Sequence, residues 1–339
     1  MTEDTIVAVS GDTIESPAVE NFRTALRGQL LRPADDAYEA ARKLWNGMID
    51  RRPALIARCT GTADVIAAVN FARDHGLRTA VRGGGHSFPG HSVCDGGLVI
   101  DLSGMKGIRV DPAARTARAQ AGVKWIDFDH ETQAFGLATS GGTVSDTGIA
   151  GLTLGGGLGW LSSKYGLTVD NLLSADVVTA DGRLLTASAT QNPDLFWGLR
   201  GGGGNFGVVT SFEYQLHAVG PTVSGGMVAY PLAQAKEVLR FYSGFTKAAP
   251  DESTTYAGLL TPPGGDTVVA LFCCYCGPLD RGEAVIRPLR SLGSPIHDAL
   301  GPLPYLAQQR IFDVGMDGPR RHQSCQAVIV CNTAKGAVP

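Results

Sequence analysis

A glycine cluster, Arg82-Gly83-Gly84-Gly85-His86-Ser87, follows directly after the apolar stretch at residues 77–81. Two more clusters follow it, GGTVSDTGIAGLTLGGGLG at residues 141–159 and RGGGGNFG at residues 200–207. Glycine adopts positive φ at no steric cost, so a single cluster is typical of a tight turn. Three clusters in one region indicate loops with exposed backbone N–H groups, which can bind the oxygens of a pyrophosphate.

Glycine is concentrated in this part of the chain. The 339 residues include 45 glycines, and 27 of these lie within residues 82–220. Soluble proteins contain roughly 7% glycine. No short period organises the glycines, which excludes collagen-like and linker sequences. The pattern indicates backbone that comes close to a ligand or to other backbone.

The third cluster contains G-x-G-x-x-G at Gly202, Gly204 and Gly207. In a Rossmann unit this motif follows a strand and opens a helix. Here a helix is predicted before the motif, at residues 193–199, and a strand after it, at residues 208–216. The order is therefore reversed. The sequence also has neither a P-loop nor a G-x-S-x-G nucleophile elbow.

Charge and composition exclude several classes of protein. The chain has 29 Lys and Arg against 32 Asp and Glu, a net charge of −3, which argues against a nucleic-acid partner. No run approaches the ~20 apolar residues that a membrane span needs. The first residues are acidic and lack the apolar core of a signal peptide. Seven cysteines in no even pattern favour a reducing compartment. We therefore expect a cytoplasmic protein without a membrane partner.

Hydrophobic periodicity predicts two parts with a boundary near residue 221. Residues 1–44 are expected to be helical and peripheral, because Ala25, Leu26, Leu30 and Leu31 recur at helical spacing. A strand–helix–strand unit typical of parallel pairing follows. The other predicted elements of the first part are short strands at 98–102, 107–110 and 116–121, a helix at 125–135 and a hairpin at 174–187. The second part is predicted to contain helices at 234–245 and 279–292 and a strand at 267–274.

His86 is the first candidate for chemistry. A lone histidine is usually structural, but the glycines before it remove side chains that would shield the imidazole. A cofactor ring could then approach, and a ring nitrogen could bond to an electrophilic carbon. By contrast, we assign Cys273, Cys274 and Cys276 to core packing, because a zinc site needs a second pair of ligands.

Four ordered motifs resemble the berberine-bridge-enzyme-like FAD-linked oxidases of the vanillyl-alcohol-oxidase/PCMH flavoprotein superfamily. The resemblance is strong over residues 45–221 and visible to about residue 320. The motifs are residues 82–103, 141–159, 175–182 and 194–210. The resemblance implies an α+β fold. A PCMH-type FAD-binding domain at 45–221 would be followed by an incomplete substrate domain, an antiparallel sheet with helices, at 222–322.

The resemblance also implies the cofactor and its site. FAD would be bound covalently, through His86 to the flavin 8α carbon. Val144 stands where doubly linked relatives have a second, cysteine link, so a single link is expected. The residues implied to contact FAD are Arg82, Gly83, Gly84, Gly85, His86, Ser87, Gly141, Ser145, Gly148, Gly151, Asn171, Gly207 and Val209.

The implied activity is that of an FAD-dependent oxidase. It would remove a hydride from a C–H carbon bearing OH or N on a small molecule, and pass the electrons to O₂ to give H₂O₂. Two alternatives remain open: a dehydrogenase of the same fold with another acceptor, and an inactive flavin-binding remnant. A dehydrogenase would differ from an oxidase in consuming no O₂ with its substrate. A remnant would be colourless when purified or would lose its flavin on dialysis.

The end of the sequence departs from the family pattern. The resemblance reaches His322, whereas residues 323–339 do not resemble the family and are expected to be an aberrant tail of a C-terminally truncated member. Relatives carry their catalytic base beyond this point, so no catalytic residue is assigned. Phe312, Val314 and Met316 alternate, which predicts a strand that lacks its partner.

Overall fold

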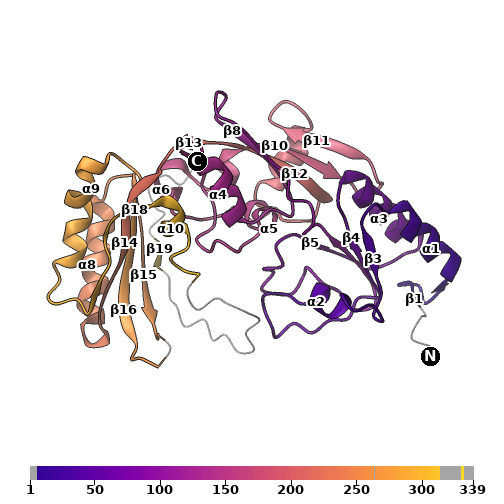
Figure 1. The fold of residues 1–339 in the computed structure, drawn as a ribbon, viewed down its shortest axis with the longest axis horizontal. Helices are drawn as coiled ribbons and strands as arrows, with labels where there is room; N and C mark the ends of the chain where they lie inside the picture. Colours follow the sequence, from indigo (N-terminus) through magenta and orange to yellow (C-terminus); the bar gives the residue numbers. More distant parts are fainter. Residues whose placement is uncertain (1–5, 263, 314–329, 332–339) are drawn as a thin grey trace.

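The computed structural model describes residues 6–262, 264–313 and 330–331. Figure 1 shows an elongated molecule with one sheet and its helices at each end and the glycine-rich segments between them. The N-terminal end contains α1 (Ser16–Ala25), α2 (Tyr38–Arg42) and α3 (Thr62–Asp74). The other end contains α8 (Ala235–Ala248) and α9 (Leu279–Ile286).

The N-terminal sheet is mainly parallel and has the order β3-β4-β6-β5. β4 and β5 run parallel to each other, as expected of the strand–helix–strand unit, but they do not pair directly, because β6 lies between them and pairs in parallel with both. β3 is antiparallel to β4. The strands are β3 (Gln29–Leu31), β4 (Leu55–Arg58), β5 (Thr79–Arg82) and β6 (Leu98–Asp101).

The prediction that residues 29–31 are helical is wrong, because they form β3. Both leucines are buried there, Leu30 in the large core that includes α1 and α3 and Leu31 in a separate cluster with Tyr38. Gly28 explains the difference. A Cβ on Gly28 would lie 1.9 Å from the carbonyl oxygen of Arg58, so only glycine lets the chain approach β4 so closely. The apolar spacing of these leucines fits a helix, but the backbone pairs with the sheet.

The second sheet is antiparallel, in the order β11-β10-β12-β8-β7. The predicted hairpin at Asp181-Gly182 is confirmed, with β10 paired to β11 and Gly182 at φ +80°. One hydrophobic core joins both sheets with the helices between them. The strands are β7 (Ile108–Asp111), β8 (Thr116–Gln120), β10 (Leu172–Val178), β11 (Leu184–Ser188) and β12 (Val208–Gln215). The helices are α4 (Trp125–Gln133), α5 (Ile149–Leu154) and α7 (Pro193–Leu199).

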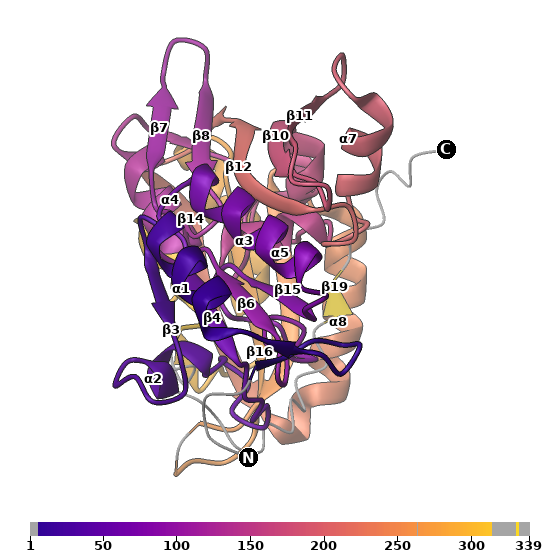
Figure 2. The same cartoon turned by 90° about the vertical axis from the view of Figure 1, so that its right-hand side faces the viewer.

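The third sheet is antiparallel and lies at the end covered by α8 and α9 (Figures 1 and 2). Cys273 packs in the core on one face of it, while Cys274 and Cys276 pack on the other, as their alternation predicts. The strands are β14 (Thr222–Pro231), β15 (Ser253–Leu260), β16 (Val268–Tyr275), β17 (His297–Asp298), β18 (Gly301–Pro304) and β19 (Val330–Cys331). β19 pairs with β15 at the sheet edge.

Short elements complete the described chain. They are β1 (Ile6–Val7), β2 (Thr13–Ile14), β9 (Leu137–Ala138), β13 (His217–Ala218), α6 (Ser162–Tyr165) and α10 (Tyr305–Gln309), with 3-10 turns at Thr168–Asn171, Leu232–Gln234 and Arg287–Arg290. Within the described ranges, no helix has the length and apolar character needed to cross a membrane.

The strand predicted around Phe312 is wrong, because Phe312 lies in a turn after α10. Its ring stacks on Trp160, with centroids 5.3 Å apart, and contacts Phe272 of β16 at 4.6 Å. The aromatic side chain therefore packs against the third sheet without joining it as a strand. Val314 and Met316 lie outside the described residues, as does the predicted tail at 323–339 apart from β19.

Candidate cofactor site

A cavity of about 890 Å³ is bordered by all three glycine clusters. Its walls come from β5 and the loop after it, from the loop that enters α5, and from the loop that enters β12. In Figure 1, β5 and α5, which adjoin the first two clusters, lie near the middle of the molecule. Clusters far apart in the sequence therefore surround one space, as expected of a ligand-binding cradle.

The first two clusters cross each other through glycine backbone. A Cβ on Gly84 would lie 2.4 Å from both Cα and N of Gly148, and a Cβ on Gly148 would lie 2.5 Å from N of Gly84. No side chain fits at this crossing. By contrast, a Cβ on Gly151 or Gly204 would meet nothing within 4 Å, although both residues line the cavity. These glycines leave cavity space open instead of filling it.

His86 lines the cavity at the end of the first cluster. Its Nε2 lies 3.1 Å from Oδ2 of Asp146, which belongs to the second cluster. Its ring stacks on the indole of Trp45, with centroids 5.4 Å apart and planes 19° from parallel. The imidazole is therefore held both at one nitrogen and on one face.

Asp146 is in turn held by two partners. Its Oδ2 faces His86, and its Oδ1 accepts a hydrogen bond from the ammonium of Lys124. The hydrogen bond with His86, with further contributions from Lys124, lowers the pKa of Asp146 to about 2. The carboxylate is thus ionised at neutral pH, and it links the residue before α4 to the cavity wall.

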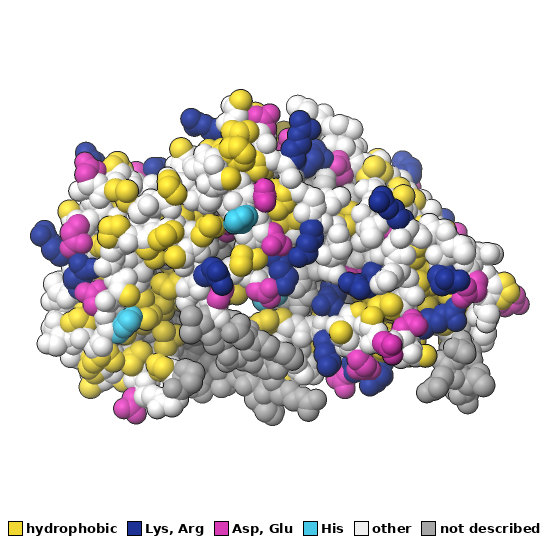
Figure 3. All heavy atoms as spheres, in the orientation of Figure 1, with side chains coloured by type: hydrophobic (Ala, Val, Ile, Leu, Met, Phe, Trp, Pro, Cys, Tyr) yellow, Lys and Arg dark blue, Asp and Glu magenta, His cyan; other side chains and the backbone are white. Residues whose placement is uncertain are grey.

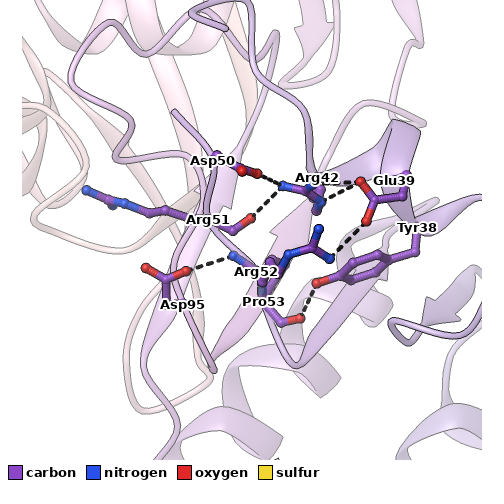
Figure 4. Close-up of polar contacts among 8 residues, drawn as sticks. All are labelled: Tyr38, Glu39, Arg42, Asp50, Arg51, Arg52, Pro53 and Asp95. Atoms are coloured by element: carbon purple, nitrogen blue, oxygen red, sulfur yellow. Dashed lines mark hydrogen bonds and ion pairs between the residues drawn. The ribbon is translucent and has the colours of Figure 1, made fainter. Parts of the chain in front are cut away.

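A charged network holds the segment that carries Trp45 (Figure 4). The Arg42 guanidinium is 7% exposed and bonds to Glu39 at 2.6 Å and to the Asp50 carboxylate. Arg52 bonds to the other oxygen of Glu39 at 3.0 Å. The Tyr38 hydroxyl donates to the carbonyl of residue 53 at 2.7 Å. These contacts fasten α2 and the loop after it to the start of β4.

Two hydrogen bonds to backbone carbonyl groups connect this segment to the first glycine cluster. The N–H of Trp45 donates to the carbonyl oxygen of Gly85 at 3.1 Å. The guanidinium of Arg82 donates to the carbonyl oxygen of Ala41. The loop that carries His86 is therefore supported from outside the cavity by α2 and its neighbours.

Most of the predicted site residues border this cavity. The nine that line it are Gly83, Gly84, Gly85, His86, Ser87, Gly148, Gly151, Gly207 and Val209. Trp45 and Asp146 were not predicted as neighbours of His86, and His91 and Asn205 were not predicted in the cavity wall. The only signal for Asp146 is an acidic residue inside the second glycine cluster.

The other four predicted residues lie outside the cavity wall. Arg82 bonds to Ala41, as described above. Gly141 packs against the indole of Trp125, where a Cβ would lie 2.6 Å from Cε3. Ser145 donates to the Asp313 carboxylate from its N–H at 2.9 Å and from its hydroxyl at 2.5 Å.

Asn171 is the fourth residue outside the wall. Its amide nitrogen donates to the carbonyl oxygens of Tyr165 and Leu167, at 2.8 and 2.9 Å. Its amide oxygen lies 2.6 Å from Nε2 of His217. In this structure the side chain holds the turn that precedes β10, and a role in binding FAD stays a prediction.

Helix α4 carries a fully buried carboxyl group, that of Asp129. Asp129 is 0% exposed, and its Oδ2 accepts a hydrogen bond of 2.6 Å from Nε2 of Gln309 on α10. Among the described residues, its Oδ1 has no hydrogen-bond partner, and the same holds for the hydroxyls of Thr139, Ser140 and Tyr305. Burial raises the pKa of Asp129 to about 7.

Comparison with known proteins agrees with this geometry. Residues 53–188 match the family model of an FAD binding domain. The chain is 37% identical over 298 residues to an FAD-linked oxidoreductase of Dictyostelium discoideum, an alignment that covers 87% of this chain and 64% of the relative. It is 36% identical over 279 residues to (R)-6-hydroxynicotine oxidase of Paenarthrobacter nicotinovorans, covering 81% and 61%.

Solved structures give the same result. The crystal structure of 6-hydroxy-D-nicotine oxidase from Arthrobacter nicotinovorans superposes with a TM-score of 0.81 at 34% identity, covering 87% of this chain and 64% of that one. The Physcomitrella patens protein BBE-like 1 superposes with a TM-score of 0.76 at 27% identity, covering 84% and 62%. These likenesses confirm the predicted α+β fold with a PCMH-type FAD-binding domain.

The chain is shorter than these relatives. It spans 59–65% of the length of the first four curated proteins that it matches. The match runs through all three glycine clusters and into the third sheet. By its family model, its relatives and its fold, the chain contains an FAD binding domain and is related to the berberine-bridge-enzyme-like FAD-linked oxidoreductases of the vanillyl-alcohol-oxidase/PCMH superfamily.

Proposed function

We propose that the chain binds FAD in the glycine-lined cavity, that His86 is joined covalently to the flavin, and that the protein is an FAD-dependent oxidase. The observation that carries this proposal is the position of His86. Its imidazole borders the cavity between two glycine clusters, and it is oriented by Asp146 and Trp45. A nucleophile placed in this way can form a covalent bond to a bound ring.

The residues around the cavity fit FAD. Gly151 and Gly204 line the cavity, and a Cβ on either would meet no atom within 4 Å, so neither position fills the space beside a ligand. Glycine-rich loops present backbone N–H groups that bind phosphate oxygens. Ser87 and Thr147, which also line the wall, can add hydroxyl donors. Val144, at the position of the second link in some relatives, has no nucleophile, so a single link through His86 is proposed.

Bound FAD supplies the redox chemistry, which is hydride removal from a substrate carbon and transfer of the electrons to O₂ to give H₂O₂. The chain's own residues bind and orient it. We propose that residues 45–221 form the FAD-binding part and that residues 222–322 border the substrate. Helix α10 packs against α4 in the first part and against β14 and β18 of the third sheet. Phe312 likewise contacts Trp160 of the first part and Phe272 of the third sheet. These contacts support the division, because they place residues of the second part against the FAD-binding part.

The proposed substrate is a small molecule with a C–H bond on a carbon that bears OH or N. This class is supported by the relatives, which include (R)-6-hydroxynicotine oxidase and structures named chitooligosaccharide oxidase and xylooligosaccharide oxidase. Both 6-hydroxynicotine and short oligosaccharides are therefore the first compounds to test.

The covalent link is tested by acid precipitation of the purified protein. We expect the wild-type pellet to stay yellow and to fluoresce under ultraviolet light. The variant His86→Ala should release its flavin into the supernatant. His91→Ala is the matched control, because His91 also lines the cavity but is not held by Asp146. Release of all flavin from wild-type protein would refute the covalent link.

The oxidase activity is tested by O₂ consumption and H₂O₂ release with each candidate substrate. Substrate-dependent H₂O₂ release supports an oxidase. Reduction of an artificial dye without O₂ consumption would instead identify a dehydrogenase. Protein that binds flavin but oxidises none of the compounds with either acceptor would contradict the proposed activity.

A further inference from the structure

Both carboxylate oxygens of Asp146 have partners, although the side chain lies at the surface. Its side chain is 57% exposed, yet each of its oxygens has a cationic or imidazole partner, Lys124 at Oδ1 and His86 at Oδ2. The backbone reinforces this arrangement, because Lys124 forms an isolated antiparallel bridge with Gly148, two residues beyond Asp146. The carboxylate is therefore fixed relative to the loop that borders the cavity.

The partner of Asp146 decides which nitrogen of His86 is free. An ionised carboxylate only accepts hydrogen bonds, so the contact of 3.1 Å requires the proton of His86 to be on Nε2. In the neutral ring the lone pair is then on Nδ1. Nδ1 has no hydrogen bond with any residue that the structure describes. Stacking on Trp45 restrains the ring against rotation.

We propose that Asp146 is a positioning residue for covalent flavin attachment: it holds the proton on His86 Nε2 and makes Nδ1 the nitrogen that bonds the flavin. This inference rests on the proposed covalent link. Beyond that link, it assigns a role to Asp146, the Nε2–H tautomer to His86 and the point of attachment to Nδ1. Second-layer carboxylates that orient a histidine act in the same way toward metals and catalytic serines.

The bond-forming step balances with O₂ as the oxidant. A proton leaves the flavin 8-methyl group, and Nδ1 donates its electron pair to form the N–C8α bond. The two electrons that the flavin ring gains in this step pass to O₂, which takes up two protons and becomes H₂O₂. Attachment through Nδ1 leaves the proton on Nε2, so the contact with Asp146 persists in the product.

The test measures attachment and not turnover. Apo-protein is produced in riboflavin-depleted cells and mixed with FAD in air, and acid-stable flavin fluorescence in the protein band is followed over time. We expect Asp146→Ala to attach flavin about 10–100-fold more slowly than wild type, the usual cost of losing such an orienting partner. Asp146→Asn should recover part of the rate, because its amide oxygen can still accept from Nε2.

Two controls separate positioning from folding and binding. Asp127→Asn alters an exposed carboxylate nearby that pairs with Lys106 at 3.4 Å, and it should attach flavin at the wild-type rate. His86→Ala and the double variant with Asp146→Ala should bind FAD non-covalently with equal affinity. A difference between these two would show that Asp146 acts on binding, and would overturn the positioning role.

The linkage itself gives a second readout. Proton NMR of the isolated flavin peptide should show attachment at Nδ1 alone in wild type and a mixture of Nδ1 and Nε2 in Asp146→Ala. If wild type attaches flavin but Asp146→Ala does so at the same rate and nitrogen, the inference is wrong and the covalent link stands. If wild type attaches none, the proposed link fails, and the inference fails with it.

Discussion

Replacing the buried Asp129 by asparagine should raise the free energy of unfolding relative to wild type, and this gain should be larger at neutral pH than at acidic pH. Burial raises the pKa of Asp129 from an ordinary 3.8 to about 7 in the folded protein. Between these values the unfolded chain has lost the proton and the folded chain has kept it. Stability from this group is therefore greatest at low pH and falls as the pH rises from about 4 to about 7.

The size of the effect follows from the two pKa values. Each pH unit in this window costs about 1.4 kcal/mol, so the full penalty above pH 7 is about 4 kcal/mol. Asparagine does not titrate, yet its amide oxygen can still accept the hydrogen bond from Gln309. The free energy of unfolding of Asp129→Asn minus that of wild type should therefore rise by about 3 kcal/mol between roughly pH 5 and pH 8.

Urea unfolding followed by tryptophan fluorescence at several pH values measures this difference. Asp127→Asn, in the same helix but with an exposed carboxylate, is the matched control and should show no comparable trend. A difference that stays flat within about 0.5 kcal/mol between these pH values would refute the reasoning. It would mean that water reaches the Asp129 carboxyl group and that this group ionises with an ordinary pKa.

Other substitutions test the cavity and its supports. Gly84→Ala should abolish FAD binding and lower the melting temperature, because its Cβ would overlap Gly148. Gly151→Ala lies in a helix with open space beside it, so it should stabilise the fold by up to about 1 kcal/mol while weakening FAD affinity in equilibrium dialysis. Arg42→Met should lower the free energy of unfolding by about 1 kcal/mol in urea unfolding, because Glu39 and Asp50 lose their partner but are 50% and 73% exposed, and flavin attachment should slow as well. Phe312→Ala should cost about 2–3 kcal/mol and expose the third sheet to dye binding.

Local sequence signals predicted much of this fold. The hairpin turn at Asp181-Gly182 and the helix that starts at Pro193 depend on residues next to each other in the chain, so their patterns are visible in the sequence. The parallel unit around α3 follows from an apolar strand, an amphipathic helix and a second strand. In contrast, Leu30 and Leu31 have helical spacing but form a strand, because a glycine lets them reach β4.

The site was predictable to a similar extent. The glycine clusters and His86 are conspicuous in the sequence, and nine of the residues named from them border one cavity. The partners of His86 are not conspicuous, because Trp45 and Asp146 lie 41 and 60 positions away from it. Contacts of this kind depend on how α2 and the second cluster pack together, and local sequence patterns do not indicate such packing.

The crossing of Gly84 and Gly148 also bears on how the protein folds. These residues are 64 positions apart, and the third wall of the cavity begins at Gly203. Closing loops of this length is slow, because chain entropy is lost before the contacts form. The cavity therefore exists only when three distant segments have docked, and partly folded chains cannot bind FAD before the covalent link has formed. A ligand that binds only the native state stabilises it by mass action, so the supply of FAD in the cell should govern how much of this protein survives proteolysis.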